Sequence, residues 1–221
     1  MPRRRGVWRG AILAGVALAM LIAGAARAAD PKPLVSRLQH HYRATDSFTA
    51  RFVETLTSPG GAPRQRGGKV AYRKPGMIRW EFDPPQPETI VADGTTLYDY
   101  DPGLNQVVEM PERSAFKNRS VAAFILGVGD LERDFDVRSV SDSAADGLAH
   151  LVLTPKEGGA KIELGVDSKS LNITNLRTAD ALGNATELQL SDIQRNVTPE
   201  ISMFTFTVPP GADIVNAAPG H

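Results

Sequence analysis

Apolar and polar residues alternate along most of the chain with the period of two that is typical of β-strands. In the stretch RKPGMIRWEFDPP, Ile78, Trp80 and Phe82 fall on one face, and the two residues between them are charged. The clearest alternation is KIELGV, in which apolar residues occupy every second position. Glycine, proline and aspartate cluster between these runs and indicate turns. We predict strands at 48–52, 68–74, 77–83, 88–92, 95–100, 105–110, 135–141, 148–154, 160–166, 171–178, 184–193 and 204–208.

Two segments depart from this alternation and predict helices. Residues 33–45 place Leu34, Leu38 and Tyr42 at helical spacing. Residues 114–127 contain no proline and hold the apolar run VAAFIL, with a serine before it that can cap a helix and a glycine after it that can end one. Because this run is apolar nearly all round, its helix must be buried against another part of the protein.

The excess of strands over helices predicts a mostly β fold. Each strand presents one apolar face, and two or three short helices are too few to cover all of them. The economical solution is one curled antiparallel sheet that folds its apolar face inward, with the helices across the opening. Side chains fill that interior completely, or they leave a cavity for a ligand with fatty parts. The pattern alone leaves both alternatives open.

The N-terminus predicts a signal peptide rather than part of the fold. Arginines crowd residues 3–9, an uncharged run spans 11–26, and Ala26-Arg27-Ala28 supplies the small residues of a cleavage site. A membrane anchor is the alternative, but the run of 16 residues is shorter than the roughly 20 that a spanning helix needs. We expect cleavage after Ala28, which leaves a single domain at 29–221.

Charge and cysteine content narrow the function classes. Residues 1–28 contain five arginines and no acid, so the mature chain has 20 basic and 25 acidic residues, a net charge near −5. A mildly acidic surface argues against a nucleic-acid partner. The sequence has no cysteine, which excludes a disulfide framework, a thiol nucleophile and lipid attachment at an N-terminal cysteine.

The residues that could support catalysis are scattered. His40 and His41 are adjacent on the predicted helix and point apart, which does not suit a shared metal ion. The sequence has neither G-x-S-x-G nor H-E-x-x-H. Asp93, Asp99 and Asp101 are close together in sequence, but the first and last belong to predicted turns. We therefore expect no enzymatic activity, no metal and no cofactor.

An ordered set of segments then carries a family resemblance. FTARFVETLTSPGG, GGKVAYRKPGMIRWEFDPP, TIVADGTTLYDYDPGLNQV, AHLVLTPK and FTFTVPPGADIV occur in that order. Together they resemble the periplasmic outer-membrane lipoprotein carrier family, LolA, over about residues 34–215. No single segment is diagnostic, whereas the ordered set with a cleavable leader and no cysteine is specific.

The resemblance implies an incomplete (half-open) antiparallel β-barrel of about eleven strands with a short helical lid. It also implies a periplasmic chaperone of a Gram-negative bacterium, acting as a monomer. Such a carrier takes acylated lipoproteins released from the inner membrane by an ABC transporter. It holds their acyl chains in an apolar cavity and delivers them to an outer-membrane lipoprotein receptor.

The resemblance further implies a latch between a cation and the lid. An arginine directly before a proline holds lid carbonyls in the family; here that position is Lys74, beside Arg73. Lysine donates from a single point and cannot fork across two carbonyls, so we expect a weaker latch or a substitute from Arg73 or Arg79. The predicted lid helix comprises Val121, Ala122, Phe124, Ile125 and Leu126.

The family's partner-docking position, an exposed hydrophobic residue beyond the same proline, falls near Ile78. Alternation alone does not say whether its side chain points inward or outward. Apolar residues on the predicted strands form the pool that could line an acyl cavity. The candidates are Trp80, Phe82, Ile90, Leu97, Leu151, Leu153, Ile162, Leu164, Phe204 and Phe206.

A second function on the same fold is a periplasmic regulator that senses lipids or lipoproteins. Such a regulator with a related fold usually carries an added C-terminal domain. This chain ends a short distance after residue 208, so we favour the carrier.

Overall fold

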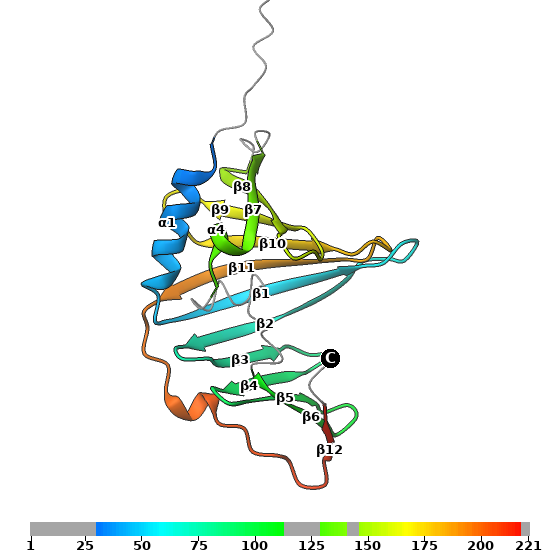
Figure 1. Ribbon diagram of the computed structural model, residues 1–221. Helices are drawn as coiled ribbons and strands as arrows, with labels where there is room; N and C mark the ends of the chain where they lie inside the picture. Colours follow the sequence, from blue (N-terminus) through cyan, green and yellow to red (C-terminus); the bar gives the residue numbers. More distant parts are fainter. Residues whose placement is uncertain (1–29, 113–128, 141–145, 218–221) are drawn as a thin grey trace, which may run out of the picture.

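The computed structural model describes residues 30–112, 129–140 and 146–217, and in this part of the chain a single twelve-stranded sheet dominates (Figure 1). The strands are β1 (Ser47–Thr57), β2 (Arg64–Arg73), β3 (Met77–Phe82), β4 (Thr89–Asp93), β5 (Thr96–Asp101), β6 (Gln106–Pro111), β7 (Phe135–Val140), β8 (Leu148–Pro155), β9 (Ile162–Asp167), β10 (Ile173–Ala179), β11 (Ala185–Arg195) and β12 (Asp213–Asn216). The helices are α1 (Lys32–Arg43), α4 (Leu131–Asp134) and the 3₁₀ helix η1 (Ile201–Phe204).

The sheet is open, as the half-open barrel prediction requires. Its strand order is β12-β6-β5-β4-β3-β2-β1-β11-β10-β9-β8-β7, so the two edges are different strands that do not pair with each other. All pairs are antiparallel except β12 with β6, which is parallel. The pairing of β1 with β11 joins the two halves of the sheet. The predicted helix at 33–45 is confirmed as α1, whereas the predicted helix at 114–127 lies outside the described residues.

The predicted last strand at 204–208 is wrong. In the structure η1 ends within this segment, and the last strand is β12, further along the chain. Phe206 stacks on Tyr98 with 5.2 Å between the ring centroids, and it lies 6.0 Å from the ring of Tyr100. The alternation of phenylalanine and threonine there therefore reflects packing onto the sheet rather than pairing with a strand.

The strand register places the apolar residues of both halves on one face, which we call the inner face. Across β1 and β11, Phe52 is opposite Leu190. Glu54, two residues further along β1 and on the same face, is opposite Leu188. Leu188 continues through Leu176 and Leu164 to Leu151, which packs with α1. Figure 1 shows α1 beside β8 to β11 and far from β4 to β6. Helix α1 thus covers one half of the inner face. On the other half, side chains of the strands pack against one another.

Two apolar clusters follow from this division. The first joins α1 to β7–β10 and contains Val35, Leu38, Tyr42, Leu131, Phe135, Leu151, Leu153, Ile162, Leu164, Val166 and Ile173. The second lies on β1–β5 and contains Phe48, Ala50, Phe52, Val70, Tyr72, Ile78, Phe82, Ala92 and Leu97, with Trp80, Ile90, Met110, Leu188, Leu190 and Ile193 partly buried against it.

Gly68 allows the aromatic rings of the second cluster to pack over the sheet. It lies opposite Phe52 on β1 and Phe82 on β3. A Cβ atom at this position would overlap the carbonyl oxygen of Glu81 and lie 2.8 Å from Phe52 Cζ. At the adjacent Gly67, a Cβ atom would meet only the carbonyl oxygen of Phe52, at 3.4 Å. The two glycines therefore have different structural roles.

We expect Gly68→Ala to destabilise the fold by roughly 1–3 kcal/mol, because the added methyl group must displace backbone or the Phe52 ring. Gly67→Ala is the matched control, in the same strand, and should change stability by less than about 0.5 kcal/mol. Urea unfolding followed by circular dichroism measures both. Equal destabilisation by the two variants would show that close ring packing over Gly68 is not the reason for this glycine.

Candidate ligand-binding face

The second cluster places two groups of aromatic rings on the inner face. Five rings form these groups, and we call them the aromatic cluster: Phe48, Phe52, Tyr72, Trp80 and Phe82. The ring of Phe52 lies 4.7 Å from Trp80 and 5.0 Å from Phe82, and Phe48 lies 5.5 Å from Tyr72. β-strand pairing brings them together, because Tyr72 is opposite both Phe48 and Ile78 in neighbouring strands. No α1 side chain belongs to this cluster among the described residues.

A charged network borders the aromatic cluster on the same face. Arg66 donates from Nε to Glu54 at 2.8 Å and from Nη1 to Glu88 at 2.5 Å. Its guanidinium carbon lies 3.9 Å from the centre of the Phe82 ring. The three charged side chains retain only 17–23% exposure. Arg66 therefore neutralises much of the surrounding negative charge while its flat face remains in contact with an aromatic ring.

Asp99 adds a further acid to this network. It lies opposite Ile90 and Val108, so it also faces inward. Burial, and then repulsion from Glu88, raises the pKa of Asp99 to about 6. By contrast, Asp93 and Asp101 accept hydrogen bonds from backbone N–H groups in turns, as predicted. Asp93 and Asp101 thus stabilise turns, whereas Asp99 lies beside Ile90 on the inner face.

The outer face of the same strands binds the C-terminal segment. Arg73 donates to the carbonyl oxygen of Pro199 at 3.0 Å, and Arg79 donates to that of Met203 at 3.1 Å. Phe204 is buried with 1% exposure at the end of η1, which contacts β3 and β4. Both arginines thus hold the C-terminal segment.

The structure divides the predicted cavity residues into three groups. Trp80, Phe82, Ile90 and Leu97 belong to the second cluster on the inner face. The next four are in the core beneath α1: Leu151, Leu153, Ile162 and Leu164. Phe204 and Phe206 belong to neither cluster, and Phe206 packs on tyrosines of β5.

Other residues of this face carried no site prediction. Phe48 and Phe52 were recognised only as strand residues, although their alternation with polar neighbours placed them on one face. Tyr72 was within a predicted strand and gave no further signal. The sequence predicts no strand at Arg66, because prolines and glycines precede it, whereas β2 begins at Arg64.

The remaining predicted residues are placed as follows. Lys74 Nζ donates to the carbonyl oxygen of Arg43 at 2.7 Å, at the C-terminal end of α1, and lies 3.6 Å from Asp46. A cation at a helix C-terminus is favourably placed with respect to the helix dipole. The lid helix lies outside the described residues, so its latch stays a prediction. The docking position implied near Ile78 is an exposed one, whereas Ile78 itself points inward and is buried with 7% exposure in the second cluster, so its docking role stays a prediction.

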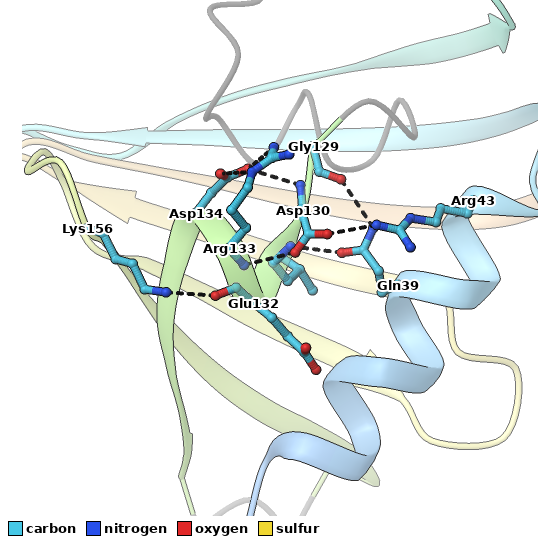
Figure 2. Close-up of polar contacts among 9 residues, drawn as sticks. Gln39, Arg43, Gly129, Asp130, Glu132, Arg133, Asp134 and Lys156 are labelled. Carbon is cyan, nitrogen blue, oxygen red and sulfur yellow. Dashed lines mark hydrogen bonds and ion pairs between the residues drawn. The ribbon is translucent and has the colours of Figure 1, made fainter.

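A polar network anchors α4 to α1 (Figure 2). The amide of Gln39, a residue with 6% exposure, donates to the carbonyl oxygen of Gly129 at 3.1 Å and accepts from the N–H of Leu131 at 2.8 Å. Arg43 pairs with Asp130 at 2.7 Å, with 59% of the arginine side chain exposed. Gln39 therefore satisfies two backbone groups at the N-terminal end of α4.

Within the described residues, no group of three or more histidine, cysteine, aspartate or glutamate side chains is arranged to hold a metal ion. No helix in the same ranges is long and apolar enough to cross a membrane. The apolar inner face with its charged border has the composition that suits an apolar ligand.

A family model and individual relatives of this chain point to the same protein family. The model of the family described as "Outer membrane lipoprotein carrier protein LolA" matches residues 43–207. The chain is 35% identical to the outer-membrane lipoprotein carrier protein of Cupriavidus necator, covering 92% of this chain and 96% of that protein. It is 34% identical to the protein of the same name from Dechloromonas aromatica, covering 82% and 86% respectively.

A solved structure supports the fold alone. An uncharacterised conserved protein from Thermus thermophilus matches with a TM-score of 0.53 and 15% identity, covering 84% of this chain and 98% of that one. At this identity the likeness shows the arrangement of the sheet and carries no functional argument.

We expect Gln39→Leu to destabilise the protein by about 2–3 kcal/mol, because it leaves the buried carbonyl of Gly129 and the N–H of Leu131 without partners. Arg43→Gln is the control from the same network. It removes an exposed ion pair, which should contribute less than about 1 kcal/mol. Thermal unfolding of both variants tests the ranking, and a larger loss in Arg43→Gln would contradict it.

Asp99 predicts a pH dependence of stability. A carboxyl group whose folded pKa of about 6 exceeds its ordinary value of 3.8 holds a proton more tightly in the folded state. Its contribution therefore favours folding below about pH 4 and is lost as pH rises from about 4 to 6. We expect Asp99→Asn to raise Tm by roughly 2–4 °C at pH 7 and by little at pH 4. Asp136→Asn, on the exposed side of β7, controls for net charge; an equal effect there would contradict the local explanation.

Proposed function

Because this chain belongs to the LolA family of outer membrane lipoprotein carrier proteins, we propose that it carries lipoproteins across the periplasm by shielding their acyl chains. The chain begins with the features of an export signal, which supports action in the periplasm. The family is one of carriers rather than catalysts, so in this proposal no covalent bond is made or broken. The observation that carries the proposal is the aromatic cluster on the half of the inner face that α1 does not cover.

The aromatic cluster has the chemistry that an acyl chain requires. Each buried CH₂ group contributes about 0.8 kcal/mol, so an acyl chain gains substantially by leaving water for an apolar surface. A carrier must also release its ligand. Moderate affinity suits that task, because a site that bound every methylene fully would hold the chain too tightly to pass it on.

We place the acyl site on the second cluster and not on the first. Side chains beneath α1 are packed against the helix, and Leu151, Leu153 and Leu164 retain no more than 1% exposure. A ligand that entered that core would have to separate α1 from the strands on which it packs. Phe52 and Tyr72 of the second cluster are buried almost as fully. However, no α1 side chain packs on that cluster, and Trp80 and Ile90 are only partly buried against it. These positions can exchange neighbours for a ligand at lower cost.

In this proposal the segment 121–126 is a lid that covers the acyl site, and Lys74 is its latch. Lys74 ties the turn after β2 to the end of α1, which would hold the rim of the site in place. Arg73 is the second latch candidate, although it holds the C-terminal segment in this structure. Ile78 would serve as a docking residue only after it leaves its buried position.

The partners follow from the carrier role. An inner-membrane ABC transporter would load the acylated lipoprotein, and an outer-membrane lipoprotein receptor would accept it. The carrier itself would act as a monomer and hydrolyse nothing. Directional transfer would require that the receptor bind the acyl chains more tightly than the carrier does.

The direct test is release of lipoprotein from bacterial spheroplasts that make a labelled outer-membrane lipoprotein. Added carrier should bring the lipoprotein into the supernatant as a one-to-one complex. Leu190→Lys places a charge on the inner face beside Phe52 and should reduce release at least about tenfold, because burying an unpaired charge is costly.

The matched control is Val53→Lys. Val53 follows Phe52 on β1, points to the outer face and is 41% exposed. This variant should retain most of the release activity. If both variants release lipoprotein as well as the unmodified protein does, the acyl site is not on this face. If the unmodified protein releases none in the presence of a working transporter, the carrier proposal fails.

A further inference from the structure

Trp80 carries a buried hydrogen-bond donor without a partner. Its Nε1 has no acceptor among the described residues, and the atom itself is shielded from solvent. An indole nitrogen can only donate. Leaving such a group unpaired typically costs about 1–3 kcal/mol, and for this reason nearly all buried donors in folded proteins have partners.

The surroundings explain why Trp80 finds no acceptor. On the inner face it is flanked by Val70 on β2 and Ile90 on β4. The rings of Phe52 and Phe82 lie 4.7 Å and 6.5 Å away. The nearest acidic side chain along this row is Asp99, two strands away, or roughly 10 Å. The donor is therefore embedded in hydrocarbon.

Packing alone does not account for a tryptophan at this position. A phenylalanine would supply an aromatic surface without an unpaired N–H group, as Phe52 and Phe82 do on either side. An acyl group, however, always has a carbonyl where it joins the ester oxygen or the amide nitrogen. That carbonyl oxygen is an acceptor that a bound acyl ligand would bring into an otherwise apolar site.

We propose that Trp80 Nε1–H donates a hydrogen bond to the ester carbonyl oxygen of the bound acyl group. This inference rests on the proposed function and adds the position of the ligand's polar end. The carbonyl would lie at Trp80, and the hydrocarbon would extend over the rest of the aromatic cluster. Trp80 would then act as a specificity residue that distinguishes acyl esters from alkyl ethers.

The experiment compares two ligands that differ only in the carbonyl group. One is an S-glyceryl cysteine peptide with two octanoyl ester chains, and the other is its dioctyl ether analogue. Both are used below their critical micelle concentrations. Isothermal titration calorimetry measures their Kd for the protein recovered from the periplasm of an expressing bacterium. We expect the ester to bind about tenfold more tightly, as one neutral hydrogen bond to a buried donor allows.

Trp80→Phe removes the donor and keeps an aromatic ring. It should bind the ester about tenfold more weakly than the unmodified protein does and should bind the two ligands equally. Phe52→Leu is the matched control, because it removes a ring of the same cluster and keeps the donor. It should weaken both ligands and preserve the preference for the ester.

If Trp80→Phe does not fold, as judged by circular dichroism, benzothienylalanine at position 80 replaces the N–H group with sulfur and keeps the shape of the indole. Loss of the ester preference in that variant would support the inference equally. Equal binding of ester and ether by the unmodified protein would overturn the inference and leave the carrier role standing. Binding of neither ligand would contradict the carrier role itself.

Discussion

The structure depends on how one sheet covers its single apolar face. Strands from both halves of the sheet share that face, but α1 shields only the part formed by β7 to β10. Twisted sheets curl, and curling lets the remaining apolar residues approach one another. The half of the face on β1–β5 is therefore built from large rings that pack together above glycine. This division separates a helix-packed core from a surface that is able to accept a ligand.

Charged side chains have different partners on the inner and outer faces of the sheet. On the inner face, Arg66 holds Glu54 and Glu88 beside Phe82, so polar groups mark a border of the aromatic surface. On the outer face, Arg73 and Arg79 bind backbone carbonyls of the C-terminal segment. The two faces of β2 and β3 thus have different partners, and the alternation of their residues determines which partner each side chain meets.

The sequence was most informative where period-two alternation is strong, and β3, with Ile78, Trp80 and Phe82 on one side, follows its pattern closely. It misled at residues 204–208, because an alternating segment that packs on tyrosines has the same pattern as a strand. It could not separate Leu151 from Leu97, since both alternate in the same way and only the position of α1 distinguishes them. Arg66 was missed because its partners are Glu54 on β1, Phe82 on β3 and Glu88 just before β4, which only the folded sheet brings together.

The acyl site that we propose on the second cluster and the hydrogen bond to the ligand both require acyl chains to bind over Trp80 on the inner face. Of the two tryptophans in the sequence, Trp8 lies in the predicted signal peptide, so Trp80 is the one source of tryptophan fluorescence in the mature protein. Acyl ligands brominated along the chain quench an indole on contact, whereas unbrominated ligands do not. We expect saturable quenching of Trp80 that follows the binding isotherm and is absent with the unbrominated ligand. Binding without quenching, at any bromine position along the chain, would show that the acyl chains bind elsewhere.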